Sequence, residues 1–202
     1  MITGTYFSQS SVNWLTNGKI VYLARKAFGG QIDLDPCPST VRSNWFAKKN
    51  WFLGGPVDSL KVGWSIDNKP TKIFVNPPFG SSYVLGTQCI GQDEHKKLPE
   101  SQADLWKQQT IYMWAEKCVK EAKEGNEIIW ISKASTETEA LQKVLEGSSG
   151  VCFPKGRVSY LDPITRQDKK QPTFGSVLLY LGNNPSPFIQ TFSEIGITRK
   201  LT

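Results

Sequence analysis

Histidine and clustered cysteine are scarce in this sequence, and their scarcity argues against two common kinds of site. His95 is the single histidine among 202 residues, and no Cys-x-x-Cys pair occurs. The four cysteines are dispersed: Cys37, Cys89, Cys118 and Cys152. Zinc sites and disulfide frameworks need these residues in clusters, so we expect no metal, no disulfides and free thiols in a reducing cytoplasm.

Long apolar runs and glycine-rich turns are also missing. No apolar run approaches the roughly 18–20 residues of a membrane-spanning helix, and the N-terminus lacks a signal-peptide pattern, so no membrane contact and a cytoplasmic location are expected. Gly29-Gly30 precede the first predicted strand, and no Gly-x-Gly or Gly-x-x-x-x-Gly-Lys-Ser/Thr motif follows any strand. This argues against a phosphate-cradling nucleotide site.

The composition is that of one globular domain with a basic surface. Hydrophobic residues make up 39% and aromatic residues 11% of the chain, and neither repeats nor low-complexity segments occur. The formal net charge of +6 is compatible with a polyanionic partner without establishing one. Composition leaves the oligomeric state open.

Apolar runs alternate with helical patterns, which predicts an α/β fold with a largely parallel sheet and an antiparallel hairpin at one edge. Residues 39–52 are predicted as a short helix or irregular segment, and residues 81–101 show no pattern. The expected helices run from Asn17 to the Gly29-Gly30 break, over about 102–124 and over 135–146. The expected strands lie at 32–35, 73–75, 127–132, 156–161 and 175–181, with a strand end at 57–60.

The stretch from Ile73 to Gly80 carries the strongest chemical signal. A short buried strand runs into Asn76-Pro77-Pro78-Phe79, whose prolines restrict the preceding residues to extended conformations and remove backbone donors. The Asn76 oxygen and the Pro77 carbonyl therefore present acceptors suited to an amine with two protons, and Phe79 could stack on a flat ring. This combination indicates methylation of an exocyclic amine on a base; a proline-rich turn that merely closes a strand is the alternative.

Acidic residues follow two other predicted strand ends. Asp33 and Asp35 alternate with apolar residues on the first strand, and Asp58 ends another. Ligands of open α/β sheets bind beyond the carboxyl ends of the strands, so we expect these acids to converge with Asn76. Such a crevice suits a cofactor that carries an ammonium and a sulfonium, such as S-adenosylmethionine.

Over most of its length the chain resembles the phage-type DNA adenine-N6 methyltransferases (the phage Dam family). Trp14-Leu15-Thr16 resembles that family's Trp-x-Thr motif, Asp33-Leu34-Asp35-Pro36-Cys37 its Asp-x-Asp-Pro/Ala-Ala/Cys signature, and Asn76–Gly80 its Asn-Pro-Pro-Tyr/Phe motif. Asp58-Ser59-Leu60 with Trp64, Trp114-Ala115 with Gly125, Gly156-Arg157-Val158 and Gly175-Ser176 match later segments. Asn17 stands where the family usually has proline, Ser132-Lys133-Ala134 replaces a more apolar segment, and the stretch 81–111 is longer than usual.

The resemblance implies a Rossmann-like methyltransferase fold in a single domain, residues 1–202, with a target-recognition insertion at about 81–111. It implies methyl transfer from S-adenosylmethionine to adenine N6 in DNA, in the cytoplasm of a prokaryotic host of a phage or prophage. The catalytic residues it implies are Asn76, Pro77, Pro78 and Phe79. The cofactor-binding residues it implies are Trp14, Thr16, Asp33, Asp35, Pro36, Cys37 and Asp58.

DNA contacts are expected in two segments. The stretch 81–111 has amides and aromatics suited to base reading, whereas the loop 162–173 is basic and suited to phosphates. The candidate DNA-binding residues are Tyr83, Lys96, Lys97, Arg157, Arg166, Lys169 and Lys170. Two alternatives stay open: methylation of another planar amine, in an RNA base or a protein glutamine, and a non-catalytic DNA-binding protein with a degenerate site.

Overall fold

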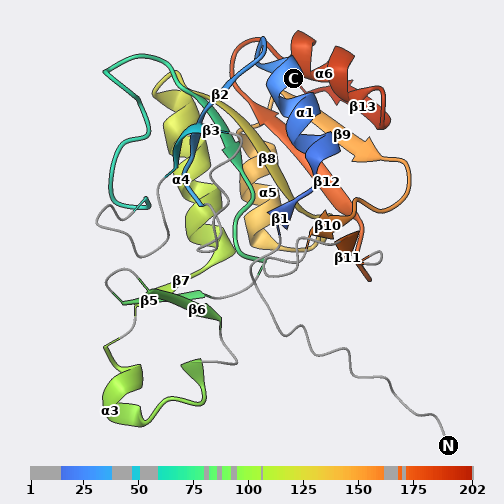
Figure 1. Ribbon diagram of the computed structural model, residues 1–202. Helices are drawn as coiled ribbons and strands as arrows, with labels where there is room; N and C mark the ends of the chain where they lie inside the picture. Colours follow the sequence, from blue (N-terminus) through green and yellow to red (C-terminus); the bar gives the residue numbers. More distant parts are fainter. Residues whose placement is uncertain are drawn as a thin grey trace, which may run out of the picture.

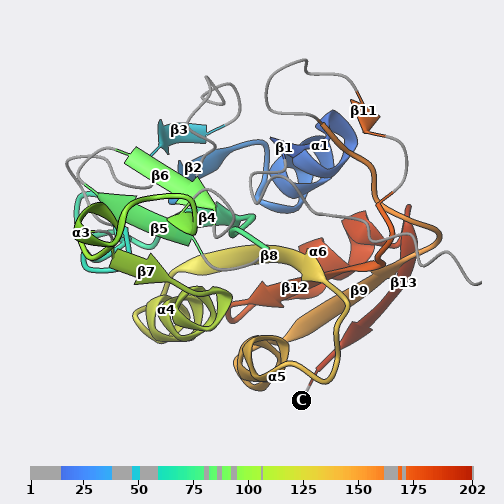
Figure 2. The same cartoon turned by 90° about the horizontal axis from the view of Figure 1, so that it is seen from below.

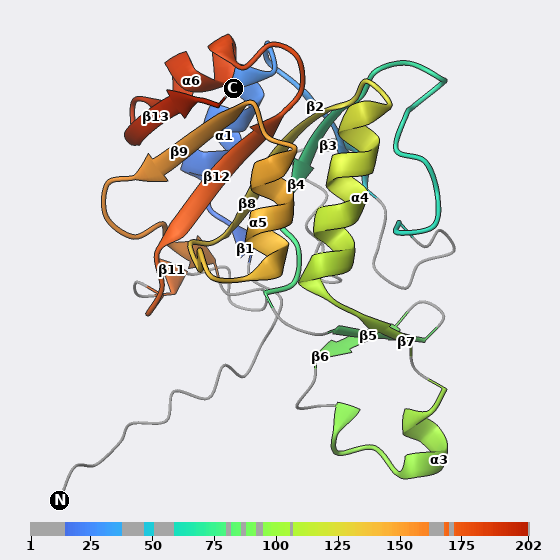
Figure 3. The ribbon, with the colours of Figure 1, turned by 180° about the vertical axis from the view of Figure 1, so that it is seen from behind.

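A seven-stranded sheet between two layers of helices forms the main body of the protein (Figure 1). Helices α1 (Gly18–Ala27) and α6 (Ser186–Phe192) pack on one face, and α4 (Ile111–Lys123) and α5 (Glu139–Glu146) on the other (Figure 3). The predicted α/β fold class is confirmed. The structure is a computed structural model that describes residues 15–37, 47–50, 59–79, 82–85, 88–91, 95–105, 107–161, 168–169 and 172–201.

The central sheet is mixed, not largely parallel as predicted. Its order is β13 (Gly196–Lys200), β9 (Gly150–Pro154), β12 (Ser176–Leu181), β8 (Glu127–Lys133), β4 (Lys72–Val75), β2 (Ile32–Asp35) and β3 (Ala47–Asn50). The four strands β3, β2, β4 and β8 run parallel. Strand β12 is antiparallel to both of its neighbours, and β13 is antiparallel to β9.

Strand β8 shows why the interior strands are continuously apolar. Ile128 and Trp130 belong to the apolar cluster under α4 and α5, whereas Ile129 and Ile131 belong to the cluster under α1 and α6. All four side chains are fully buried. A strand covered on both faces has no solvent side, so its sequence loses the usual alternation of polar and apolar residues.

The predicted C-terminal hairpin is wrong, because its two strands belong to different sheets. Every residue of β12 is buried, which suits a place inside the central sheet, between β8 and β9. Of the predicted strand 156–161, only β10 (Tyr160–Leu161) is extended, and it pairs with β1 (Leu15–Thr16) and β11 (Asp168–Lys169) in a small antiparallel sheet. The sequence did not predict β9 and β13.

Capping residues set the ends of the helices. The Asn17 side chain accepts a hydrogen bond from the Ile20 N–H at 3.0 Å and starts α1 where predicted; Gly29 and Gly30, both with positive φ, end it. The predicted helix 102–124 is instead divided into α3 (Glu100–Ala103), β7 (Lys107–Gln109) and α4. Thr110 caps α4 by accepting a hydrogen bond from the Met113 N–H. Thr138 caps α5 in the same way, so this helix begins at Glu139 and not at the predicted residue 135.

The described residues between 82 and 109 form a separate lobe beside the start of α4 (Figures 1 and 2). The lobe covers most of the stretch 81–101, which is predicted to have no pattern, together with the first part of the predicted helix 102–124. It contains a three-stranded antiparallel sheet and the short helix α3. The sheet order is β6 (Gln88–Gly91), β5 (Ser82–Leu85) and β7. Ser82 is the register partner of Gln109, so the two ends of the lobe lie side by side. They connect to the main body, the seven-stranded sheet with its two layers of helices, which we call the sandwich.

Candidate functional site

The strand order reverses between β2 and β4. From β2 the chain moves to β3 on one side, and it then returns to place β4 on the other side of β2. In open α/β sheets the carboxyl ends of the strands at such a reversal form the ligand-binding crevice. Here β2 ends at Asp35, before Pro36-Cys37, and β4 ends at Val75, before Asn76. The fold therefore brings the two expected motifs together at the carboxyl ends of β2 and β4. We call this side of the sheet the edge.

Asn76 connects three segments that are far apart in the sequence. Its side-chain Nδ2 donates a hydrogen bond to Thr16 Oγ1 at 3.1 Å, and its Oδ1 is buried. Its backbone N–H bonds to the thiol of Cys37. Thr16 is itself buried and is held by the pairing of β1 with β10. The Trp-x-Thr, Asp-x-Asp-Pro-Cys and Asn-Pro-Pro-Phe segments thus meet at a single asparagine.

The two prolines of the turn keep this asparagine in place. Pro77 and Pro78 are both buried, whereas Asn76 and Phe79 on either side are partly exposed. Because the prolines carry no N–H, the backbone here offers carbonyl acceptors without competing donors. This turn is consistent with the predicted geometry, in which the Asn76 side-chain oxygen and the Pro77 carbonyl lie next to each other at the end of a strand.

Phe79 lies in an aromatic cluster beneath a lysine. Its ring meets Tyr160 and Phe174 edge-on, with centroids 5.5 Å away in both pairs. The Lys133 Nζ lies 5.8 Å from the Phe79 centroid and 4.9 Å from that of Phe174, and burial lowers the pKa of Lys133. Lys133 ends β8, so it shares the edge with Asn76.

Sequence reasoning did not identify this cluster as part of the site. Lys133 was noted only as a departure from the family pattern, although a basic residue directly after the apolar run of β8 was a usable signal. Tyr160 and Phe174 gave no signal of their own. Their contacts with Phe79 depend on the fold of segments 81 and 95 residues later in the chain.

Asp35 is a buried acid at the centre of the edge. It is 4% exposed and accepts a hydrogen bond from the Cys37 N–H at 3.1 Å. Burial raises its pKa to about 7, with the Cys37 hydrogen bond opposing the rise. No lysine or arginine in the described part of the chain forms an ion pair with it. A cationic donor would stabilise the ionised form of this buried carboxyl, and the ammonium of the expected cofactor is such a donor.

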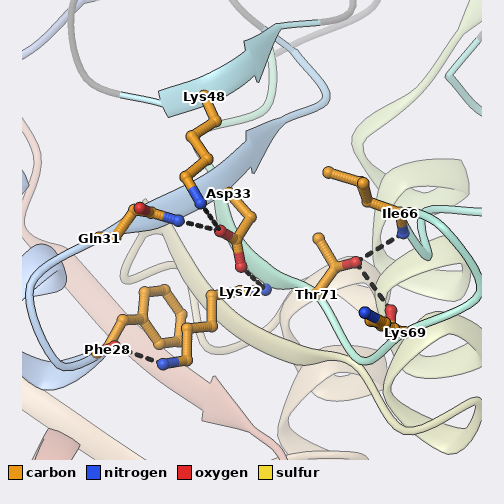
Figure 4. Close-up of polar contacts among 8 residues, drawn as sticks. All are labelled: Phe28, Gln31, Asp33, Lys48, Ile66, Lys69, Thr71 and Lys72. Atoms are coloured by element: carbon orange, nitrogen blue, oxygen red, sulfur yellow. Dashed lines mark hydrogen bonds and ion pairs between the residues drawn. The ribbon is translucent and has the colours of Figure 1, made fainter.

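Asp33 has different contacts, within the sheet (Figure 4). One carboxylate oxygen accepts from Gln31 Nε2 and lies 3.7 Å from Lys48 Nζ, while the other accepts from the Lys72 N–H at 3.1 Å. These contacts connect β2 with β3 and β4. The cofactor role expected for Asp33 stays a prediction, and its observed contacts give it a structural role.

Several predicted residues lie outside the described part of the chain: Trp14, Asp58, Arg166 and Lys170, as does the Lys169 side chain. The chain directly after Asp58 is described. Ser59 is buried, and its carbonyl accepts a hydrogen bond from the Trp64 indole at 2.8 Å. This contact connects the chain that follows Asp58 to Trp64, which belongs to the apolar cluster under α4 and α5.

The described DNA-binding candidates occupy two separate places. Tyr83 stacks on His95 in the lobe at a centroid distance of 3.7 Å, and Lys96 and Lys97 are exposed beside it. Arg157 lies between β9 and β10, where it is exposed and donates to the Pro172 carbonyl at 2.7 Å. The lobe and the β9–β10 loop therefore form two distinct candidate surfaces.

The described residues contain no group of three or more histidines, cysteines or acids that could hold a metal ion. Nor do they form a helix long and apolar enough to cross a membrane. Comparison with known proteins gave no match to any family model, to any curated protein or to any solved structure.

Proposed function

We propose that this protein is an S-adenosylmethionine-dependent methyltransferase that modifies the N6 amino group of adenine in DNA. The observation that carries the proposal is the convergence at Asn76: its side chain bonds Thr16 and its backbone bonds Cys37, at the strand-order reversal. These three residues belong to the three segments on which the family resemblance rests. The Rossmann-like fold expected for such an enzyme is consistent with the α/β sandwich.

The chemistry needs acceptors more than it needs an acid or a base. The adenine N6 lone pair is conjugated with the ring and is a poor nucleophile. Hydrogen bonds from the two N6 hydrogens to Asn76 Oδ1 and the Pro77 carbonyl favour a pyramidal nitrogen. They also stabilise the positive charge that develops as the methyl group arrives, which is stabilisation directed at the transition state. As the nitrogen–methyl bond forms, the methyl–sulfur bond breaks and S-adenosylhomocysteine is the leaving group; one N6 hydrogen then leaves as a proton to water.

Thr16 has a positioning role in this mechanism. The hydrogen bond from Asn76 Nδ2 to Thr16 Oγ1 holds the amide in one orientation, which fixes the position of Oδ1. A preorganised acceptor needs no rearrangement during the reaction. The N-terminal motif would therefore act on the reaction through the catalytic asparagine.

The residues at the edge fit the cofactor. Asp35 would receive the ammonium group, and the Thr16 and Pro36-Cys37 segments would form the walls on either side of it. S-adenosylmethionine supplies an electrophilic methyl group on a sulfonium. The chain's contribution is to hold the adenine amine in line with that methyl group and to exclude water from the buried Asp35 carboxyl and Asn76 Oδ1.

Target recognition divides between Phe79 and the lobe. A duplex hides its adenines, so the target base has to leave the stack, and Phe79 is the stacking partner in the turn. Its edge-on contacts with Tyr160 and Phe174 hold the ring upright. The lobe follows this turn in the chain, and we expect it to contact the neighbouring bases.

The test is the identity of the methylated product. The protein is incubated with isotopically labelled S-adenosylmethionine and, separately, duplex DNA, single-stranded DNA, RNA and a glutamine-containing peptide. We expect label in DNA, recovered as N6-methyladenine after digestion. Label confined to RNA or peptide would replace DNA as the substrate, and cofactor binding by calorimetry without any transfer would favour the non-catalytic alternative.

A further inference from the structure

A basic pocket of about 940 Å³ lies outside the candidate site. It is formed by the start of α1, the chain that follows β9, and the connection from α6 to β13. We call it the α1–β9 pocket. None of the residues assigned to the methyl-transfer site lines it, except that Arg157, one of the candidate DNA contacts, lies in its wall.

The α1–β9 pocket opens at the same edge of the sheet as Asn76. Strand β8 is parallel to β4, and β12 is antiparallel to both β8 and β9, so β9 runs in the direction of β4. The end of β9 at Pro154 and the end of β4 therefore lie at one edge. Gly196, the first residue of β13, is the register partner of Pro154 and belongs to the same edge.

The pocket and the methyl-transfer site share a wall. Asn17 and Ser159 both line the pocket, and Asn17 Nδ2 donates to the Ser159 carbonyl at 2.7 Å. The residues next to them in the chain face the site: Thr16 bonds Asn76, and Tyr160 contacts Phe79. A ligand bound in the pocket would therefore lie beside the methyl-transfer site.

The lining of the pocket is cationic, with apolar patches. Lys19, Lys155 and Arg157 are exposed in it, and the one acid among its described lining residues, Glu194, is in an ion pair with Lys26. Phe153 and Ile197 are also exposed there, at 49% and 61%. Cations between apolar side chains suit a sugar–phosphate chain, because phosphates need charge and deoxyribose offers an apolar face.

We infer that the α1–β9 pocket receives the phosphodiester backbone of the DNA substrate beside the methylated adenine. This inference rests on the proposed function, and it adds a surface on the sandwich to the lobe as a DNA contact. Phosphate contacts carry no base information, so this surface fixes the register of the duplex while the lobe reads sequence.

The test is the salt dependence of duplex binding. Binding is measured by fluorescence anisotropy of a labelled duplex, without any cofactor. The variant is the double substitution Lys19→Gln and Lys155→Gln. The matched control is Lys120→Gln with Lys123→Gln, which removes the same charge from exposed lysines at the end of α4 that lies away from this edge. Neither pair is buried, so both proteins should fold.

We expect the pocket variant to bind roughly tenfold more weakly at moderate salt. The slope of log K against log salt concentration should become shallower by about 2, since each lost phosphate contact removes about 0.9. The control should keep the wild-type slope. Equal slopes in all three proteins would overturn the inference.

Cofactor binding and methyl transfer at saturating DNA separate this inference from the proposed function. A wild-type protein that methylates adenine while the pocket variant keeps its salt slope refutes the pocket alone. A wild-type protein that binds no DNA at low salt refutes both. A pocket variant with normal cofactor affinity, a normal rate at saturating DNA and a reduced slope supports both.

Discussion

The sandwich and the lobe differ in how their side chains are buried. Phe74, Ile129 and Trp130 of the sandwich are fully buried. Among the lobe residues whose side chains the structure describes, Ser82 and Gln109 are the buried ones; both are polar, and both lie at its base. The sandwich is thus stabilised by an apolar core, whereas the described side chains of the lobe are mostly exposed and polar, and its strands are joined by pairing.

This difference separates two properties of the protein. Stability and the rate of methyl transfer should depend on the sandwich and its edge, because the core fixes the relative positions of Thr16, Asp35 and Asn76. The choice of target should depend on the lobe, because its polar side chains face outward. Substitutions in each region can break or sharpen this division.

The largest effect on stability should come from a core side chain. Phe74→Ala removes a fully buried ring from the cluster under α1 and α6 and should lower the free energy of unfolding by about 3–5 kcal/mol. Leu105→Ala in the lobe, where the side chain is 60% exposed, should change it by less than about 0.5 kcal/mol. Urea titrations followed by circular dichroism measure both; equal losses would contradict the comparison.

The largest effect on the reaction should come from Asn76→Ala. Removing an acceptor used in the transition state should lower the rate of methyl transfer by about 10²–10³-fold or more, with little change in stability or cofactor affinity. Asn183→Ala is the matched control, since Asn183 is exposed in the turn after β12. Full activity in Asn76→Ala would remove this motif from the mechanism.

A smaller effect is expected on cofactor binding through Asp35. The pKa of this carboxyl is about 7, and an ammonium binds its ionised form, so cofactor affinity should rise as pH increases through about 7. Asp35→Asn should weaken binding roughly ten- to a hundredfold above pH 8 and abolish this pH dependence. Calorimetry between pH 5.5 and 8.5 measures both; an unchanged profile in the variant would exclude Asp35 from the cofactor site.

The same carboxyl should influence the stability of the free protein in the opposite direction. Its pKa is raised by folding, so the folded state binds more protons than the unfolded state between about pH 4 and 7. Its contribution to stability is therefore greatest in acid and is lost as pH rises through about 7. The difference in unfolding free energy between wild type and Asp35→Asn should follow this curve.

The smallest effect should come from the lobe. Tyr83→Ala removes the stack on His95, worth about 1 kcal/mol, and should change the ratio of methylation among competing adenines several-fold while total transfer stays near normal. Tyr22→Ala is the control, because Tyr22 is 62% exposed on the sandwich. Mapping N6-methyladenine across a long duplex distinguishes them; identical maps would assign target choice elsewhere.

The sequence predicted what local patterns determine. Apolar runs followed by Asp35 or Asn76 located two strand ends correctly, and capping chemistry located Asn17 and the Gly29-Gly30 break. The Asn17 side chain has a second role besides the cap. Its amide bonds both Ile20 and Ser159 and so connects α1 to the β9–β10 chain.

What the sequence did not predict depends on pairing between distant segments. Strand β13 has mostly exposed side chains and is defined by its ladder with β9. In the lobe, β7 contains no apolar residue and is defined by its pairing with β5. Asp33 shows the limit for side chains: its sequence context matched that of Asp35, but its partners come from β3 and β4.

The pairing of Ser82 with Gln109 has a consequence for how such a chain can change its specificity. The two ends of the lobe are adjacent, and the entropic cost of closing a loop grows slowly with loop length, so a longer lobe costs little more than a shorter one. A tight turn that joined the same two strands would also fit at the base of the lobe. The lobe can therefore be exchanged as a unit. A different insertion at this position would keep the Asn-Pro-Pro-Phe turn on one side and the Thr110 cap of α4 on the other, both unchanged.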